Sequence, residues 1–231
     1  MPVQPARPTL AVMTAPAASA SAAVKHYGDV HALDGVTVDF ERGAFTAIMG
    51  PSGSGKSTLM HCVAGLDSLT AGEVAIGGTV LSRLSDRELT ELRRERIGFV
   101  FQAFNLLPAL DAQENITLPA RLGGKPSDAE WLDLVIDTVG LRDRLDHRPA
   151  ELSGGQQQRV AVARALATRP EIVFADEPTG NLDSRSSAEL LKFLRRAVDE
   201  LGQTLVMVTH DPAAAESADR VLHMLDGRIV S

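Results

Sequence analysis

One stretch of the sequence has the composition of a phosphate-binding loop, with glycines, small hydroxyl residues and a lysine close together. It consists of Gly50, Pro51, Ser52, Gly53, Ser54, Gly55, Lys56 and Ser57, and Thr58 follows it. The pattern is G-x-x-x-x-G-K-[ST], in which the glycines let backbone N–H groups face a phosphate. We expect Lys56 to reach the terminal phosphates of a nucleoside triphosphate and Ser57 to hold Mg²⁺. The alternative is a turn that is merely rich in glycine and serine, which the strand before it and the helix after it argue against.

Two adjacent acids supply groups that nucleotide hydrolysis needs. Asp176 and Glu177 directly follow residues 172–175, whose apolar run is typical of a buried strand. The first acid suits a role in holding Mg²⁺, and the second can orient or deprotonate the attacking water. Two acids at a strand end can also be only a surface turn, so their assignment depends on the phosphate-binding loop lying nearby.

A second helix start has the features of an anion site. Leu152, Ser153, Gly154, Gly155 and Gln156 open a helical segment that continues to about residue 166. Ser153 is placed as the N-cap, and the two glycines leave the positive end of the helix bare. One nucleotide cannot easily use both this helix start and the phosphate-binding loop if they lie far apart in one fold. The pattern therefore indicates a site shared between subunits.

The elements around these residues predict an α/β protein. Apolar segments predict strands at 45–49, 172–175 and 204–209, and these end at the phosphate-binding loop, the acid pair and His210. Helical segments lie between the strands, so we expect a parallel sheet that is covered on both faces. Ligands bind at the carboxyl ends of such strands, where all three candidate groups fall.

Other segments complete the predicted layout. Alternation at 36–40 predicts a half-buried strand, and Asp226-Gly227 predicts a hairpin turn near the end of the chain. Prolines and a helical pattern without a strand predict an inserted α-helical subdomain at about 103–150. Residues 1–22 are rich in proline and alanine, so we expect a disordered extension there and a domain over 23–231.

Composition excludes several classes of protein. The net charge is −7, from 30 acidic and 23 basic residues, which argues against a nucleic acid partner bound through a broad basic face. No run approaches the roughly 18–20 apolar residues that span a bilayer, so any role at a membrane requires a partner chain. The single cysteine, Cys62, excludes an internal disulfide and fits a reducing compartment.

The phosphate-binding loop, the helix start, the acid pair and His210, in their order along the chain, resemble the nucleotide-binding subunit of ATP-binding cassette (ABC) transporters. The likeness covers about residues 24–231, and the five residues from Leu152 to Gln156 are its most specific part. It implies a P-loop NTPase core with a mostly parallel sheet, an N-terminal antiparallel β portion and the helical insertion. It also implies ATP and Mg²⁺ as cofactors, hydrolysis of ATP to ADP and phosphate, and a head-to-tail dimer with a second, identical subunit. In that dimer the helix start of one subunit closes over the ATP of the other.

The resemblance assigns further roles by position. Tyr27 corresponds to the aromatic residue that stacks on adenine, with a surface tyrosine as the alternative. Gln102 corresponds to the loop glutamine that contacts Mg²⁺ or water and senses the membrane partner. Asp183 corresponds to the loop that crosses the dimer, where Asn181 departs from the usual Ser-Ala-Leu-Asp form. His210 corresponds to the histidine that contacts the γ-phosphate, with a structural histidine as the alternative. The implied catalytic residues are Glu177, His210 and Gln102, and the implied metal ligands are Ser57, Gln102 and Asp176.

Residues 84–89 and 93–108 narrow the likeness to the macrolide-export and lipoprotein-release branch. Its members work with integral-membrane permeases and include a cell-division pair, so we expect an ATPase on the cytoplasmic, inner face of the cell membrane that drives export. Two alternatives remain: an ATPase that transmits force to cell-envelope enzymes without transport, and a soluble ABC ATPase of DNA repair or translation.

An apolar cluster after Gln102 either receives a cytoplasmic helix of the permease or fills the helical subdomain. This cluster consists of Phe104, Leu106, Leu107 and Leu110.

Overall fold

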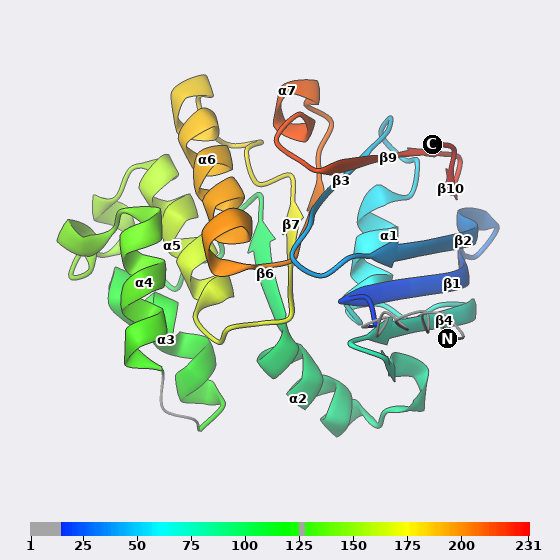
Figure 1. Cartoon of the computed structure of the whole chain (residues 1–231), viewed down its shortest axis with the longest axis horizontal. Coiled ribbons are helices and arrows are strands. Elements are labelled where there is room, and N and C mark those ends of the chain that lie inside the picture. Colours follow the sequence, from blue (N-terminus) through cyan, green and yellow to red (C-terminus); the bar gives the residue numbers. More distant parts are fainter. Residues whose placement is uncertain (1–14, 125–127) are drawn as a thin grey trace, which may run out of the picture.

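In the computed structural model, which describes residues 15–124 and 128–231, the larger of two sheets has six strands and is mostly parallel. Its strands, in spatial order, are β10 (Arg228–Ile229), β9 (Arg220–Leu225), β3 (Phe45–Met49), β8 (Leu205–Val208), β7 (Ile172–Asp176) and β6 (Ile97–Phe101). The pairs from β9 to β6 are parallel, while β10 runs antiparallel to β9 in the predicted hairpin. In Figure 1, β6 and β7 point toward the top of the view, so their carboxyl ends lie there.

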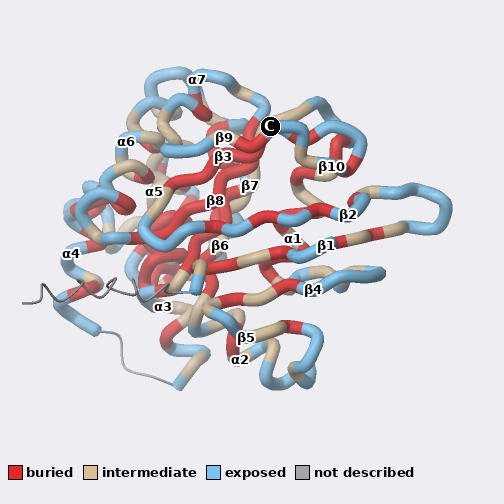
Figure 2. The backbone as a smooth tube through the Cα atoms, turned by 45° about the vertical axis from the view of Figure 1, so that its right-hand side comes forward, coloured by how far each residue is buried: buried red, intermediate tan, exposed pale blue. Residues whose placement is uncertain are grey.

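The larger sheet is buried on both faces because apolar side chains point to either side of its strands. Phe45 and Ala47 of β3 pack into one hydrophobic core, whereas Ile48 packs into the other. Val173 and Phe174 of β7 divide between the two cores in the same way. Figure 2 shows the central strands in red, as buried. Parallel pairing then aligns the carboxyl ends of β3, β7 and β8 at one edge.

The smaller sheet is antiparallel, which confirms the expected N-terminal β portion. It consists of β2 (Val30–Phe40), β1 (Ala18–Tyr27), β4 (Ala71–Ile76) and β5 (Thr79–Val80). Because β1 begins at Ala18, the prediction of a disordered extension over 1–22 is wrong for residues 18–22, while residues 1–14 lie outside the described residues. β1 pairs with β2 on one edge and with β4 on the other, and Ala18, Ala20 and Ala23 are buried. Pairing on both edges outweighs the low strand propensity of alanine.

Helices cover both faces of the larger sheet. They are α1 (Lys56–Val63), α2 (Asp86–Arg96), α3 (Ala112–Leu122), α4 (Ala129–Val139), α5 (Gly154–Leu166), α6 (Ser184–Leu201) and α7 (Pro212–Ala215). Short 3-10 helices lie at Leu81–Arg83, Arg142–Arg144 and Pro149–Glu151. Figure 1 shows α3 to α6 on one side of the sheet, with α1 and the smaller sheet on the other. Together with the two sheets, this arrangement confirms the expected fold class.

The helical segment between β6 and β7 is the part that the sequence marks as a subdomain. α3 and α4 lie within 103–150, and α5, which begins after residue 150, packs against both of them. The helical layer therefore extends past the predicted boundary. Within 15–124 and 128–231, no helix is long and apolar enough to cross a bilayer.

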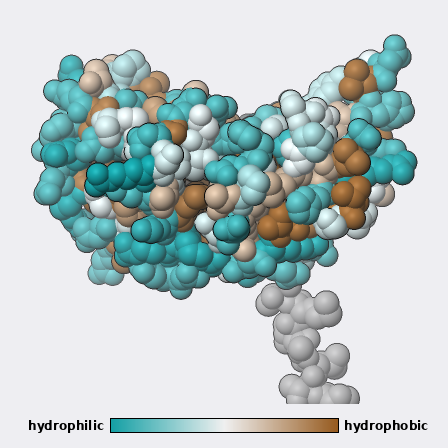
Figure 3. Space-filling view, turned by 90° about the horizontal axis from the view of Figure 1, so that it is seen from above, coloured by the Kyte–Doolittle hydropathy of each residue, from teal (hydrophilic) through white to brown (hydrophobic). Residues whose placement is uncertain are grey.

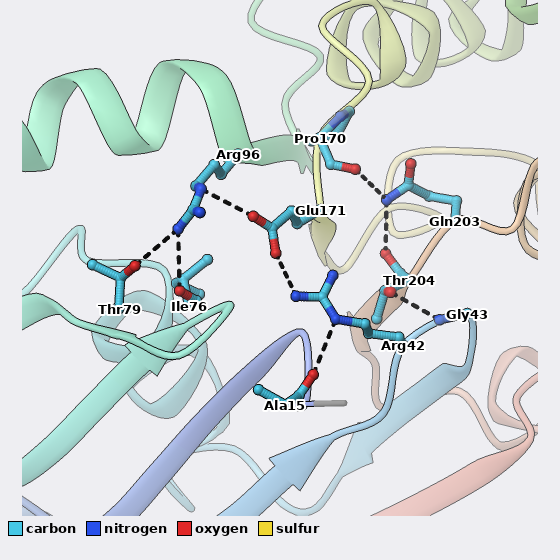
Figure 4. Close-up of polar contacts among 10 residues, drawn as sticks. All are labelled: Ala15, Arg42, Gly43, Ile76, Thr79, Arg96, Pro170, Glu171, Gln203 and Thr204. Atoms are coloured by element: carbon cyan, nitrogen blue, oxygen red, sulfur yellow. Dashed lines mark hydrogen bonds and ion pairs between the residues drawn. The ribbon is translucent and has the colours of Figure 1, made fainter. Parts of the chain in front are cut away.

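An ion-pair cluster at the amino-terminal ends of the strands joins the two sheets. Glu171, just before β7, accepts a hydrogen bond from Arg42 at 2.7 Å and forms an ion pair with Arg96 at 2.9 Å. Arg42 also donates to the carbonyl oxygen of Ala15, and Arg96 donates to the hydroxyl of Thr79. Figure 4 shows these contacts. Because the cluster lies at the opposite ends of the strands from the acid pair, it serves the fold rather than the candidate site.

Candidate nucleotide-binding site

The phosphate-binding loop joins β3 to α1, as the sequence predicts. Gly50 has a φ of 152° and Gly55 a φ of 98°, values that residues with a side chain rarely adopt. A Cβ at Gly50 would overlap the carbonyl oxygen of Met224, and a Cβ at Gly55 would overlap that of Ala32. The loop can therefore follow this path only with glycine at both positions. α1 begins directly after Gly55 without a side-chain cap, so its first N–H groups are available to an anion.

The polar groups at the start of α1 lie against the acid that ends β7. Lys56 is 8% exposed, and its Nζ donates to the carbonyl oxygen of Pro51 at 2.8 Å. Ser57 Oγ donates to Asp176 Oδ1 at 3.1 Å. Burial raises the pKa of the Asp176 carboxyl, and the hydrogen bond from Ser57 partly opposes this. His61 Nε2, one turn along α1, lies 3.7 Å from Asp176 Oδ2, although the sequence pattern gives His61 no role.

The pairing of Ser57 with Asp176 fits a Mg²⁺ site. Hydroxyl and carboxylate oxygens are the hard ligands that Mg²⁺ prefers, and nucleotide phosphates usually supply the rest of its coordination shell. In the described part of the chain, no group of three or more His, Cys, Asp or Glu side chains could hold a metal ion.

Glu177 and His210 follow neighbouring strands and face each other. Glu177 has a φ of 47°, a left-handed conformation that is uncommon outside glycine, and its N–H donates to the carbonyl oxygen of Val208 at 2.9 Å. Both carboxylate oxygens of Glu177 lie 2.9 Å from His210 Nδ1. This hydrogen bond is the main reason that the pKa of His210 is raised above its usual value. Tertiary contacts thus hold the carboxylate on strained backbone, as is common at functional sites.

Tyr27 ends β1 beside the phosphate-binding loop. Its side chain remains accessible, and the residue is 49% exposed. The hydroxyl donates to Asp67. The hydrogen bond to Asp67, more than any other cause, raises the pKa of Tyr27 to about 12. The hydroxyl therefore stays protonated and acts as a hydrogen-bond donor.

These residues surround a cavity of about 490 Å³. Of the predicted site residues, the cavity is lined by Tyr27, Ser52, Gly53, Gly55, Lys56, Ser57, Thr58, Glu177 and His210. Gly50, Pro51 and Ser54 belong to the same loop, and Asp176 reaches the site through its contact with Ser57. Figure 3 views the chain from above Figure 1, onto the ends of β6 and β7, and shows a mostly hydrophilic face. The arrangement suits a charged ligand with one end against Tyr27 and the other against the loop.

The start of α5 lies outside this cavity. Ser153 Oγ accepts from the N–H of Gln156 at 3.3 Å, and the N–H of Ser153 donates to Gln156 Oε1 at 2.9 Å, so Ser153 is the N-cap. Leu152 is buried in the core, whereas Ser153 is exposed. Among the described residues that line the cavity, none belongs to 152–156. One copy of the chain therefore does not bring the second helix start to the pocket of the phosphate-binding loop.

Gln102 contacts the loop before α6. Its Nε2 donates to Asn181 Oδ1 at 3.2 Å, and Asn181 Nδ2 donates to the Gln102 carbonyl oxygen at 3.0 Å. Gly180 leaves room for this pairing, because a Cβ there would lie 2.7 Å from Gln102 Nε2. The structure thus places the Gln102 amide against Asn181, and its contact with Mg²⁺ or water stays a prediction.

Asp183 lies on the same loop and caps α6. Its Oδ1 accepts from the N–H groups of Arg185 and Ser186, each at 3.0 Å. Hydrogen bonds from Ser186 are the main reason that the pKa of the Asp183 carboxyl is lowered. Its role in a dimer contact stays a prediction.

Gln158 is a residue near the site that the motifs do not identify. It is 0% exposed on α5, and its Nε2 donates to the carbonyl oxygens of Phe101 at 3.2 Å and Pro178 at 2.8 Å. Phe101 directly precedes Gln102, and Pro178 directly follows Glu177. Gln158 and the apolar Val162 are four residues apart and therefore share one face of α5. This spacing is the sequence signal from which the burial of Gln158 could have been predicted.

A glycine loop between a strand and a helix, with acids and a histidine at neighbouring strand ends, defines a P-loop nucleotide-binding site. A family model described as ABC transporter matches residues 33–180, and the chain belongs to this family. The chain is therefore an ATP-binding cassette and an ATPase.

Curated relatives match most of the chain. An uncharacterized ABC transporter ATP-binding protein of Thermotoga maritima is 48% identical over 87% of this chain and 86% of its own length. The lipoprotein-releasing system ATP-binding protein LolD of Bacteroides fragilis is 43% identical over 89% of this chain and 96% of its own length. The macrolide export ATP-binding/permease protein MacB of Bdellovibrio bacteriovorus is 46% identical over 87% of this chain, but over only 31% of its own length. The chain thus corresponds to nearly all of LolD and to one part of MacB.

A solved structure of the bacterial ABC transporter cassette MJ0796 is a dimer. It matches with a TM-score of 0.82 and 40% identity, over 93% of this chain and 97% of that one. A dimeric post-hydrolysis state of the same cassette, bound to ADP and Pi, matches with a TM-score of 0.81 and 41% identity. These likenesses confirm both the fold class and the ATPase activity predicted from the sequence.

Proposed function

We propose that the chain is the ATP-hydrolysing subunit of an export transporter, and that it acts as a head-to-tail dimer on an integral-membrane permease at the inner face of the membrane. The observation that carries this proposal is the start of α5, which has the geometry of an anion site but lies outside the cavity of its own chain. A second copy, placed head to tail, would bring Ser153 and its glycines to that cavity. The dimeric state of MJ0796 supports the dimer, and the names of LolD and MacB support export through a permease.

Within one subunit, different cavity residues bind different parts of ATP. Lys56 and the first N–H groups of α1 bind the phosphates, and Tyr27 stacks on the adenine. Ser57 and Asp176 would hold Mg²⁺, which supplies positive charge to the terminal phosphates. The helix start of the partner subunit covers the phosphates from the other side.

Hydrolysis depends on the pair at the ends of β7 and β8. Glu177 accepts a proton from the water that attacks the γ-phosphate. His210 keeps Nδ1 toward Glu177, which leaves Nε2 to contact the γ-phosphate. ATP bridges the two subunits, so its binding closes the dimer, and loss of phosphate removes the bridge. Such a difference in affinity between two states is what lets a ligand drive a change of shape.

The variant Glu177→Gln tests both the site and the dimer. We expect hydrolysis to fall by roughly 10²- to 10⁴-fold, because the general base is lost while the shape of the side chain is kept. ATP binding should survive, so the variant should form a stable dimer with ATP and Mg²⁺, measured by light scattering. Lys56→Ala is the control that should lose nucleotide binding and hence the dimer. A Glu177→Gln chain that stays single with ATP, Mg²⁺ and the permease present would remove the proposal.

The apolar cluster after Gln102 provides a test of the permease contact. Leu106 packs against the core, whereas Leu107 is 47% exposed and available to a partner. Leu107→Ser should therefore uncouple ATPase activity from the reconstituted permease. Leu134, which is 48% exposed on α4, is a matched site, and Leu134→Ser should leave the coupling intact. Coupling that survives Leu107→Ser in a folded protein would show that this residue does not contact the permease.

A further inference from the structure

A polar cluster lies behind Tyr27, outside the residues that line the cavity. Lys25 Nζ donates to Asp67 Oδ1 at 2.6 Å and to the carbonyl oxygen of Ser68 at 2.7 Å. The other carboxylate oxygen of Asp67 accepts from the Tyr27 hydroxyl. The side chain of Lys25 is only 10% exposed, and that of Asp67 is 30% exposed. One carboxylate therefore fixes both the hydroxyl of an accessible ring and a nearly buried cation.

Lys25 also covers one face of the aromatic ring. Its Nζ lies 4.7 Å from the centroid of the Tyr27 ring, within the range of a cation–π contact. Tyr27 nevertheless lines the cavity and is 49% exposed. The face that Lys25 does not cover is therefore the one left for a base to stack on.

Asp67 connects the ring to the helix that carries the phosphate-binding groups. It lies four residues after the end of α1, and its N–H donates to the carbonyl oxygen of His61 at 3.3 Å. The Tyr27 hydroxyl is thus tied, through Asp67, to the last turn of α1, and the ring is not held by β1 alone. This link fixes the spacing between the ring and the phosphate-binding loop.

We propose that Asp67 and Lys25 are positioning residues that hold the Tyr27 ring at the distance and angle required for the base of the nucleotide. This inference rests on the proposed function, in which Tyr27 stacks on adenine. Neither residue lines the cavity, so both would act through Tyr27. Their removal should therefore weaken binding of a ligand that has a base and spare binding of one that has only phosphates.

The test compares ADP with inorganic pyrophosphate, each with Mg²⁺, by calorimetry on the full chain. Tyr27→Ala should raise the Kd for ADP about 10-fold, which corresponds to about 1.4 kcal/mol. Asp67→Asn, Lys25→Met and Tyr27→Phe should each raise it about 3- to 5-fold. The Kd for pyrophosphate should stay within about 2-fold throughout. Because Tyr27→Phe and Asp67→Asn both act on the hydrogen bond between these residues, the double variant should lose less affinity than the sum of the two single losses.

Glu171→Gln controls for a general loss of stability. Glu171 also forms ion pairs with two cations, its side chain is 24% exposed, and it lies at the far ends of the strands. It should leave both Kd values unchanged.

Each outcome of the comparison has one meaning. Parent-like ADP binding by Asp67→Asn and Tyr27→Phe, with a loss in Tyr27→Ala, would overturn the positioning role but leave stacking intact. Parent-like binding by Tyr27→Ala would remove stacking from the proposed function itself. If Asp67→Asn weakened pyrophosphate binding as much as ADP binding, Asp67 would act on phosphate binding rather than on the Tyr27 ring, and the inference would be overturned.

Discussion

Substitution of the buried Gln158 is predicted to change both the stability of the fold and the rate of ATP hydrolysis. Its amide donates to the carbonyl oxygens of Phe101 and Pro178, which adjoin Gln102 and Glu177. Gln158→Met keeps the length of the side chain but removes both hydrogen bonds. Each buried carbonyl left without a partner costs about 1–3 kcal/mol. The substitution also removes Gln158 Oε1, which itself has no partner among the described residues and whose loss returns about 1–3 kcal/mol. We therefore expect a net destabilisation of about 2 kcal/mol.

Urea unfolding measures this change, with circular dichroism for the whole chain and fluorescence of Trp131, the single tryptophan, for the helical layer. With an m value of about 2–3 kcal/mol/M, the midpoint should fall by about 0.7–1 M. Gln157→Met is the matched control, because the neighbouring Gln157 is only partly buried and donates to a single carbonyl oxygen, that of Leu152. Its cost should stay below about 1 kcal/mol. Equal shifts in the two variants would refute the stabilising role assigned to the two Gln158 hydrogen bonds.

The same variants separate stability from catalysis. The loops that Gln158 holds carry the proposed base and the loop glutamine, and among the described residues no hydrogen bond joins Gln158 to the phosphate-binding loop. Gln158→Met should therefore lower kcat for ATP about 10-fold, or about 1.4 kcal/mol of activation free energy, and leave KM within about 2-fold. An increase in KM alone would show that the residue acts on nucleotide binding instead.

Three further predictions follow from particular contacts. The Glu177 hydrogen bond raises the pKa of His210, so this pair stabilises the fold fully below the unfolded pKa of about 6.5 and loses its effect as the pH rises through the folded value. Glu177→Gln should lower that pKa in an NMR titration, and an unchanged value would contradict the pairing. Glu171→Gln should lower the free energy of unfolding by about 1–2 kcal/mol, because two arginines lose a shared carboxylate; a loss below about 0.5 kcal/mol in urea unfolding would show that the cluster contributes little. Gly98→Ala places a methyl group against a backbone carbonyl of α5 and should cost about 1–3 kcal/mol. Gly154→Ala meets only ordinary contacts and should cost less than about 0.5 kcal/mol. Equal midpoints of thermal unfolding for the two variants would show that the close approach at Gly98 does not affect stability.

The strand ends could be predicted because short local patterns specify them. Gly50 and Gly55 occupy positions where a side chain would overlap backbone atoms, so the residue type itself reports the conformation. Residues 172–175 form an uninterrupted apolar run, which is what a strand buried on both faces requires. Parallel pairing then brings Asp176, Glu177 and His210 to the loop without any further sequence signal.

Other parts of the fold depend on partners that lie far away in the sequence. β1 is rich in alanine and serine, and it forms a strand because β2 and β4 pair with its two edges. Gln102 and Asn181 are 79 residues apart, and neither residue type alone indicates the reciprocal hydrogen bonds between them. Asp67 likewise reaches Tyr27 across 40 residues. Polar contacts of this kind carry no periodicity, so they become visible only when the fold is known.

In the proposed dimer, α5 is the element that connects one nucleotide site to the other. Ser153 at its N-terminus would meet the nucleotide of the partner, while Gln158, five residues and about 7.5 Å further along, holds two loops of its own site. A helix transmits displacement as a rigid body, so a shift of Ser153 must either move the loops that carry Gln102 and Glu177 or break the Gln158 hydrogen bonds. Release of the bridging phosphate at one site should therefore change the positions of Gln102 and Glu177 at the other site. Gln158→Met removes this link and leaves Ser153 in place, so the Hill coefficient of ATP hydrolysis should fall toward about 1 while ATP still closes the dimer. If cooperativity were unchanged in that variant, the two sites would have to communicate by a route other than the Gln158 hydrogen bonds, such as the loop of Asn181 and Asp183, which contacts Gln102.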